Sequence, residues 1–215
     1  MISTVLMNEN QKDIASMEFS EVVHKRRMVR HFKTEAIPAE VITRIFELAQ
    51  HAPSAGFTQG QSFVVVTRPE LKKEIARFCT EEDYADTFQH PFISEAPVLA
   101  IPCTRESAYH QRYQEADKVD DDGQEIEWPV PFWFMDIGCS VMILLQAVVN
   151  EGLAAAFVGI PGKENNAGLK QLLNIPEDCT PVGVIPIGYA APDVPSPSLK
   201  RGRKAQADFL HLEGW

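Results

Sequence analysis

The sequence has few of the residues that build disulfide or metal sites. Its four cysteines, Cys79, Cys103, Cys139 and Cys179, are widely separated, and none belongs to a CxxC pair. This spacing argues against a structural zinc site, a thioredoxin-like redox motif and a disulfide framework. We therefore expect four reduced thiols, buried as small apolar side chains, in a reducing cytoplasmic compartment.

Further absences narrow the class of protein. We find no internal repeat, no low-complexity linker and no basic stretch followed by an apolar run, so we expect no signal peptide. The 215 residues are 45% hydrophobic and 23% charged, which suits one soluble globular domain. The net charge of −10 argues against nucleic acid as a partner. We assign residues 1–17 to an N-terminal tail and residues 18–215 to a single domain.

Familiar catalytic signatures are also missing. The six histidines are scattered without metal-ligand spacing, and no acid–base or nucleophile motif occurs. The glycine-rich GxGxxG fingerprint of nicotinamide-binding domains is absent as well. If the protein is an enzyme, we expect a bound cofactor to carry the chemistry, with no catalytic side chain and no metal.

Helix and strand patterns alternate without a regular βαβ rhythm. Apolar residues at helical spacing predict helices over 19–25, 37–51, 69–79, 133–151 and 164–173. Continuous apolar runs predict buried strands over 62–67, 96–104, 154–160 and 182–190. This mixture predicts an α+β layered domain.

The predicted helix over 133–151 is apolar almost all round. A membrane span needs about 20 apolar residues. This helix carries Asp136, Gln146 and Asn150, so we expect a central helix or one buried against a partner subunit.

Residues 105–131 form a polar, acidic and aromatic segment. We predict an excursion from the core, acting as a lid over the active site, and we call it the excursion. Its aromatic residues are Tyr109, Tyr113 and Trp128. The sequence supports two roles for them equally: packing within the lid, or contact with a ligand.

Two basic knots stand out in this acidic chain. The stretch RRMVRHF holds Arg26, Arg27 and Arg30, and KRGRK covers 200–204. Cations this close repel one another, so they either meet an anion or are solvated.

In order and spacing, RRMVRHF, APSAGFTQGQSFVVVTRPE and PVGVIPIGYAAPDVPSPSLKRGRK resemble the FMN-dependent nitroreductase superfamily, over residues 18–215. The resemblance implies a central, mainly antiparallel sheet flanked by helices. It also implies an intertwined homodimer with an exchanged C-terminal segment.

By this resemblance the anion is the phosphate of FMN. Arg26, Arg201 and Arg203 would bind it, because guanidinium groups match phosphate oxygens. Arg30 would lie at the N1–C2=O edge of the isoalloxazine, where a cation favours the reduced ring.

Other positions are implied to contact the ring system. Arg27 and Met28 would contact the cofactor through backbone or edge contacts. The backbone N–H of Gly159 or Ile160 would point at flavin N5. The alternative is that Gly159 serves only the turn before Pro161.

The loop at 53–57 is implied to serve the FMN of the neighbouring subunit. Pro53, Ser54 and Ala55 are small and admit close approach to the cofactor. Many relatives have asparagine where this chain has Phe57, whose ring either packs near the cofactor or forms part of the substrate pocket.

The implied activity is ping-pong hydride transfer at flavin N5. NADH or NADPH would be the donor, and a nitroaromatic, quinone or similar electrophile the acceptor. One alternative is a specialist of the superfamily, either an enzyme that makes dimethylbenzimidazole from reduced FMN or a reductive dehalogenase. Another is a non-catalytic, flavin-binding redox sensor. The sequence does not distinguish the donor or name the acceptor.

Overall fold

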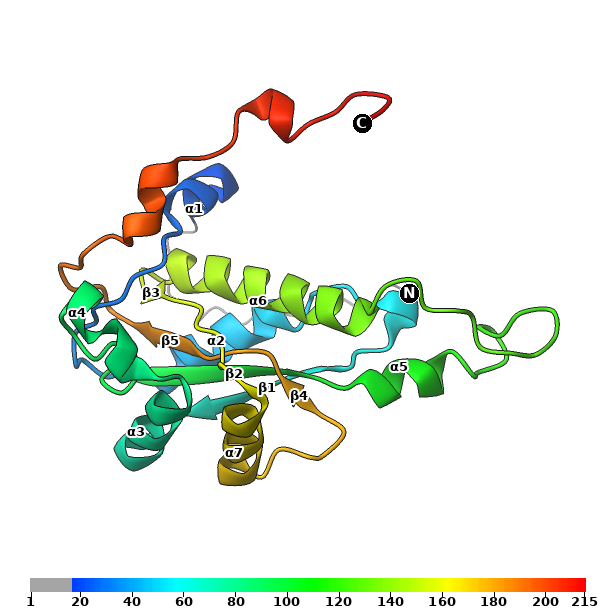
Figure 1. Ribbon diagram of the computed structural model, residues 1–215, viewed down its shortest axis with the longest axis horizontal. Coiled ribbons are helices and arrows are strands. Elements are labelled where there is room, and N and C mark those ends of the chain that lie inside the picture. Colours follow the sequence, from blue (N-terminus) through cyan, green and yellow to red (C-terminus); the bar gives the residue numbers. More distant parts are fainter. Residues whose placement is uncertain (1–16) are drawn as a thin grey trace, which may run out of the picture.

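The computed structural model describes residues 17–215 of the protein (Figure 1). The predicted tail at 1–17 therefore lies outside the described residues, apart from Met17. The helices are α1 Phe19–Lys25, α2 Ala39–Ala49, α3 Pro69–Phe78, α4 Ala85–Phe88, α5 Glu106–Arg112, α6 Phe132–Asn150 and α7 Lys163–Leu173. Short 3₁₀ turns are η1 Ala55–Phe57, η2 Glu81–Tyr84, η3 Pro197–Arg201 and η4 Gln206–Asp208. The strands are β1 Gln61–Val66, β2 Val98–Thr104, β3 Ala154–Ala155, β4 Thr180–Pro181 and β5 Ile185–Gly188.

The strands form one sheet in the order β1-β2-β5-β3, with β4 beside β2. Each of these strand pairs is antiparallel, and β1 pairs with β2 from Gln61↔Thr104 to Val66↔Leu99. At the β3 edge a single parallel bridge joins Met28 to Ala155. The predicted α+β class with a mainly antiparallel sheet is confirmed.

Strand β2 explains why the sheet has helices on both faces. All seven of its residues are buried, and successive side chains point to opposite faces. Leu99 and Ile101 belong to an apolar cluster with α3 and α7, whereas Val98 and Ala100 belong to a second cluster with α2 and α6. Figure 1 shows the sheet between these two helical layers.

Helix α6 is long and apolar enough to cross a membrane by length and composition. Here half of it is buried inside the protein, where it packs on α2, β1, β2 and β3. It is the central helix that the sequence predicts. Phe134, Met135 and Met142 remain exposed on its outer face.

Several local predictions differ from the structure. The expected strand over 154–160 is regular only at β3 and then continues through one bridge at Val158. Residues 81–88, acidic and without a clear periodic pattern, form η2 and α4. The excursion, predicted to lie outside the core, contains α5, whose Tyr109 is fully buried and belongs to the packed interior. The exposed Cys139 departs from the expected burial of all thiols.

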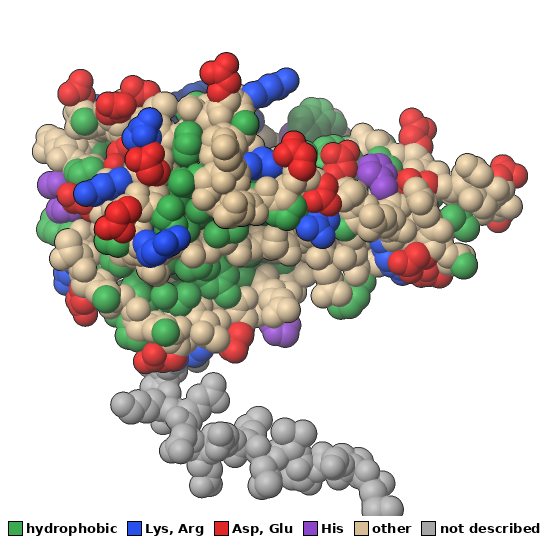
Figure 2. All heavy atoms as spheres, turned by 90° about the horizontal axis from the view of Figure 1, so that it is seen from below, with side chains coloured by type: hydrophobic (Ala, Val, Ile, Leu, Met, Phe, Trp, Pro, Cys, Tyr) green, Lys and Arg blue, Asp and Glu red, His purple; other side chains and the backbone are tan. Residues whose placement is uncertain are grey.

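Two segments reach away from the packed layers. The excursion extends sideways from the body and carries several acidic side chains (Figure 2). After β5 the chain continues through η3 and η4 as an arm, residues 197–215, which is exposed throughout (Figure 1). The arm exposes apolar side chains that a single subunit leaves uncovered: Leu199, Phe209, Leu210, Leu212 and Trp215.

Candidate functional site

The first basic knot runs along the β3 edge of the sheet. It begins where α1 ends, and the Val29 N–H donates to the Ala155 carbonyl at 3.0 Å. Val29 and Phe32 are buried, whereas Arg26 and Arg30 are only partly so. The sheet therefore fixes the backbone of this segment while its arginines remain accessible.

Among residues 17–215, the guanidinium groups of both knots form no ion pair with a carboxylate, although the Arg30 backbone N–H donates to Asp193 Oδ2 at 3.3 Å. Within residues 17–215, no ion pair within 4.0 Å involves Arg26, Arg27, Arg30, Arg201 or Arg203. Arg201 and Arg203 are exposed on the arm. In a chain with ten excess negative charges, these cations remain available to an external anion.

Arg30 is partly buried against aromatic rings. Its guanidinium lies 4.6 Å from the ring centroid of Phe88 and 6.0 Å from that of Phe92. Burial lowers its pKa, and nearby Tyr84 and Asp193 oppose that shift. The structure thus places this cation against an aromatic wall formed by α4 and the loop after it.

Gly159 and Ile160 follow the bridge between Val158 and Val184. Among residues 17–215, no acceptor pairs with the Gly159 N–H. A Cβ built on Gly159 would meet no atom within 4 Å. The position therefore offers an open backbone donor with room for a ligand beside it.

Side chains of α5 and α6 hold the loop at 53–57 in place. The Ala55 N–H donates to Oδ2 of Asp136 at 2.8 Å, and the Tyr109 hydroxyl donates to the same oxygen at 2.8 Å. Burial raises the pKa of Tyr109, and the hydrogen bond to Asp136 raises it further. Arg112 Nε donates to the Gly56 carbonyl at 3.0 Å. These contacts fix the loop backbone.

The sequence pointed to no site role for Asp136 or Arg112, and for Tyr109 it left ligand contact and packing within the lid equally open. A carboxylate inside an otherwise apolar helix was the available signal at Asp136, because a buried carboxylate needs donors. Its partner Ala55 is 81 residues away in sequence, so no local pattern pairs the two.

The two halves of the predicted site lie at opposite ends of α6 within one subunit. Arg27 borders Val149 and Gly152 at the C-terminal end, whereas Asp136 holds the loop near the N-terminal end. From Asp136 to Asn150 the helix rises about 21 Å. Figure 1 shows β3 and α1 at one end of α6 and the cyan segment containing η1 at the other. One subunit does not bring the knot and the loop together.

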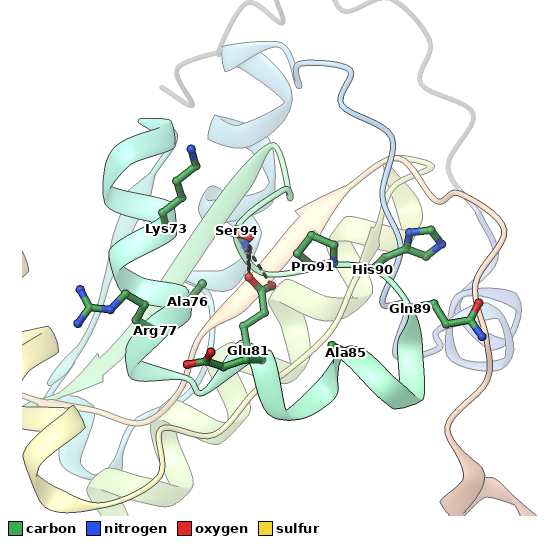
Figure 3. A pocket seen from close by; sticks show the side chains of 10 residues that line it. Lys73, Ala76, Arg77, Glu81, Ala85, Gln89, His90, Pro91 and Ser94 are labelled. Atoms are coloured by element: carbon green, nitrogen blue, oxygen red, sulfur yellow. Dashed lines mark hydrogen bonds between the residues drawn. The ribbon is translucent and has the colours of Figure 1, made fainter.

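A separate pocket of about 710 Å³ lies between α3 and the 81–94 segment (Figure 3). Lys73 and Arg77 stand on one wall, and His90 lies on the other. Its Glu81 carboxylate is already engaged by Ser94, through both the backbone N–H and the hydroxyl. None of the predicted site residues lines this pocket.

The known proteins most usefully compared with this chain carry two kinds of name, nitroreductase and iodotyrosine deiodinase. A protein of Methanothermobacter thermautotrophicus named "Putative NADH dehydrogenase/NAD(P)H nitroreductase" is 27% identical, over 94% of this chain and 90% of its own length. Iodotyrosine deiodinase of Nematostella vectensis is 30% identical, over 90% of this chain and 75% of its own. A solved structure of an iodotyrosine deiodinase bound to FMN and 3-iodo-L-tyrosine shares the fold, with a TM-score of 0.63 and 22% identity over 84% of this chain and 94% of its own. Residues 23–189 match the nitroreductase family. The chain therefore belongs to the nitroreductase family.

Proposed function

We propose that the protein is an FMN-dependent oxidoreductase. It takes electrons from NADH or NADPH and passes them to a nitroaromatic, a quinone or a similar electrophile. The observation that carries this proposal is the set of five arginines, in two basic knots of a chain of this family, whose guanidinium groups form no ion pair among residues 17–215. FMN is the cofactor of this family and supplies hydride transfer when it is bound.

The residues present fit this cofactor. Arg26, Arg201 and Arg203 would hold the phosphate, because guanidinium groups bind its oxygens bidentately. Arg30 would place a partly desolvated positive charge beside the ring, with Arg27 and Met28 contacting its edge.

Backbone groups complete the proposed site. The open N–H of Gly159, or that of Ile160, would orient the reactive edge of the ring. Pro53, Ser54 and Ala55 would approach the cofactor from the other side.

The geometry of α6 supports a homodimer as part of this proposal. The knot and the loop lie about 21 Å apart along this helix, so a site that uses both requires a second copy. The exposed Phe134 and Met135 and the apolar arm offer surfaces that such a partner would cover. The arm carries Arg201 and Arg203, so its placement on the partner would also deliver the phosphate ligands.

A reductive dehalogenase is the second candidate. The iodotyrosine deiodinase of Nematostella vectensis matches at 30% identity over 90% of this chain, which favours halogenated aromatic substrates as an alternative. The two functions share the cofactor and differ in the acceptor, so the same experiment separates them.

The test is anaerobic reduction of the purified protein by NADH and by NADPH, followed at the flavin absorbance band. Bleaching with either donor, then recovery on adding a naphthoquinone or a nitroaromatic, supports the main proposal. Recovery only with 3-iodo-L-tyrosine, with release of iodide, supports the dehalogenase. A bound flavin that neither nucleotide reduces contradicts the proposed donor.

The phosphate assignment has its own test. Replacing Arg201 and Arg203 together with alanine should yield protein that purifies without flavin. Replacing Lys200 and Lys204 with alanine removes the same charge from the same knot and should leave the flavin bound. Full flavin content in the double arginine variant contradicts the assignment.

A further inference from the structure

The loop at 53–57 continues into a backbone of uncommon shape. Gly56, Phe57 and Gln59 have φ values of +59°, +56° and +56°. Glycine adopts this left-handed region freely, whereas a bulky side chain such as that of Phe57 is strained there. Strain of this kind persists only where surrounding contacts determine the conformation. The shape of this loop therefore depends on what holds it.

Asp136 connects the loop with both α6 and the excursion. Its Oδ2 atom accepts a hydrogen bond from the Ala55 N–H and another from the Tyr109 hydroxyl, each at 2.8 Å. The side chain is almost fully buried. Hydrogen bonds to a carboxylate are charge-assisted, and they are stronger than those between neutral groups. A single oxygen atom thus ties the loop backbone to the first helix of the excursion.

The excursion also touches the loop directly. The Arg112 Nε atom donates to the Gly56 carbonyl at 3.0 Å. A Cβ built on Gly56 would lie 2.8 Å from the Tyr113 ring, and one built on Gly60 would lie 2.5 Å from the Tyr109 ring. Both rings therefore lie against the loop backbone. We call these contacts, together with those of the α6 carboxylate, the buttress.

The excursion holds Arg112 in the orientation that the buttress needs. Its two terminal nitrogens donate to the two carboxylate oxygens of Asp117, each at 2.7 Å. These hydrogen bonds lower the pKa of Asp117 to about 2. A guanidinium group is planar, so a bidentate contact on one edge also fixes the direction of the Nε–H. That direction is toward the Gly56 carbonyl.

A loop of small side chains meets a ligand mainly through its backbone. The residues proposed to approach the cofactor of the neighbouring subunit are Pro53, Ser54 and Ala55, none of which has a long side chain that could adjust. Contact then depends on where the backbone lies before the ligand arrives. A loop that has to become ordered on binding loses affinity, whereas a loop that is already ordered does not.

We propose that Asp136 is a positioning residue for cofactor binding. It acts through the loop: its carboxylate holds Ala55 in the place from which the loop reaches the FMN of the neighbouring subunit. Tyr109 and Arg112 act with it, so the start of the excursion is a strut of the cofactor site. This inference rests on the proposed FMN-dependent function and adds the residues that set cofactor affinity from behind the loop.

The experiment compares D136A, D136N and the control L169A with the wild type. D136A removes both hydrogen bonds, whereas the amide oxygen of D136N can still accept from both donors. L169A removes buried packing on α7, in the helical layer on the other face of the sheet, and reproduces a general loss of stability. Three quantities are measured: the Kd of FMN for each apoprotein, the amide hydrogen exchange of residues 53–60 in the apoprotein, and the thermal unfolding midpoint.

We expect D136A to bind FMN about tenfold more weakly than the wild type, because the loop must then become ordered on binding. Its residues 53–60 should exchange faster. D136N should recover most of the affinity and the slow exchange. L169A should have a lower unfolding midpoint, with the wild-type Kd for FMN and wild-type exchange in the loop.

A folded D136A variant with the wild-type Kd for FMN overturns the role of Asp136. Equal weakening in L169A also overturns it, because general stability would then explain the effect, and so does a D136N variant as weak as D136A. If D136A does not fold, the comparison of Y109F with Y113F decides, because Y109F removes one of the two donors to Asp136. Y109F should bind FMN about threefold more weakly than Y113F, and equal Kd values overturn the inference.

Failure of the proposed function gives a different result. A wild-type apoprotein that binds no FMN contradicts that function, whatever the variants do. Faster exchange of residues 53–60 in D136A would still show that the carboxylate fixes the loop, because this measurement needs no cofactor.

Discussion

The hydrogen bond between Tyr109 and Asp136 gives a sharp prediction about stability. The Tyr109 side chain is fully buried, and Asp136 is 8% exposed. Removing the hydroxyl in Tyr109→Phe leaves the Ala55 N–H as the one remaining donor to this carboxylate among residues 17–215. A hydrogen bond to a charged group contributes about 1.5–3 kcal/mol. For a chain of this size, that corresponds to a decrease of about 3–12 °C in the unfolding midpoint.

The assay is thermal and urea unfolding of wild type and Y109F at one fixed protein concentration, because subunit association would also shift the midpoint. Tyr113→Phe is the matched control, because its hydroxyl has no hydrogen-bond partner within the part of the chain that the structure describes. Y109F should be clearly less stable than Y113F. Equal stability of the two variants would refute the reasoning about Asp136.

The remaining predictions concern titration and thiol access. The hydrogen bond to Glu125 raises the pKa of His110, so its stabilisation is present below about pH 6.5 and is lost as pH rises through the raised pKa. The difference in unfolding midpoint between wild type and H110Q should therefore be largest near about pH 5.5 and close at alkaline pH, and a constant difference contradicts the pairing. Burial raises the pKa of Cys79 and of Cys103 to about 12, so both should react slowly with a disulfide reagent at neutral pH. Cys139 on the outer face of α6 should react slowly in a dimer and faster on dilution; fast reaction at every concentration contradicts burial of that face.

Much of the fold was predictable because its signals are local. Buried strands such as β2 are continuous apolar runs, and α6 is apolar over its whole length. Residues 81–88 were not predictable in this way. Their acidic side chains have no helical apolar pattern, and Glu81 serves instead to bind the Ser94 backbone. Tertiary contacts, which a sequence pattern does not record, determine that segment.

The candidate site likewise combines features that the local sequence predicts with features that depend on tertiary contacts. The sequence predicts that Arg26 and Arg203 are available to an anion, because both belong to basic clusters in an acidic chain. The position of the knots relative to the loop depends on where α6 begins and ends in space. The buttress depends on Asp136 meeting a backbone group 81 residues away. Only folding brings those two together.

The bridges at the β3 edge have a consequence for cofactor exchange. The Val29 N–H donates to the Ala155 carbonyl and the Lys33 N–H to the Tyr189 carbonyl, so the sheet already orders the segment that carries the first arginines. Its backbone has little freedom left to lose when a ligand arrives. Unfolding the protein should therefore be unnecessary for removing one flavin and installing another. Analogues with altered rings but an intact phosphate tail become practical reporters for this chain, loaded by dialysis at constant ionic strength.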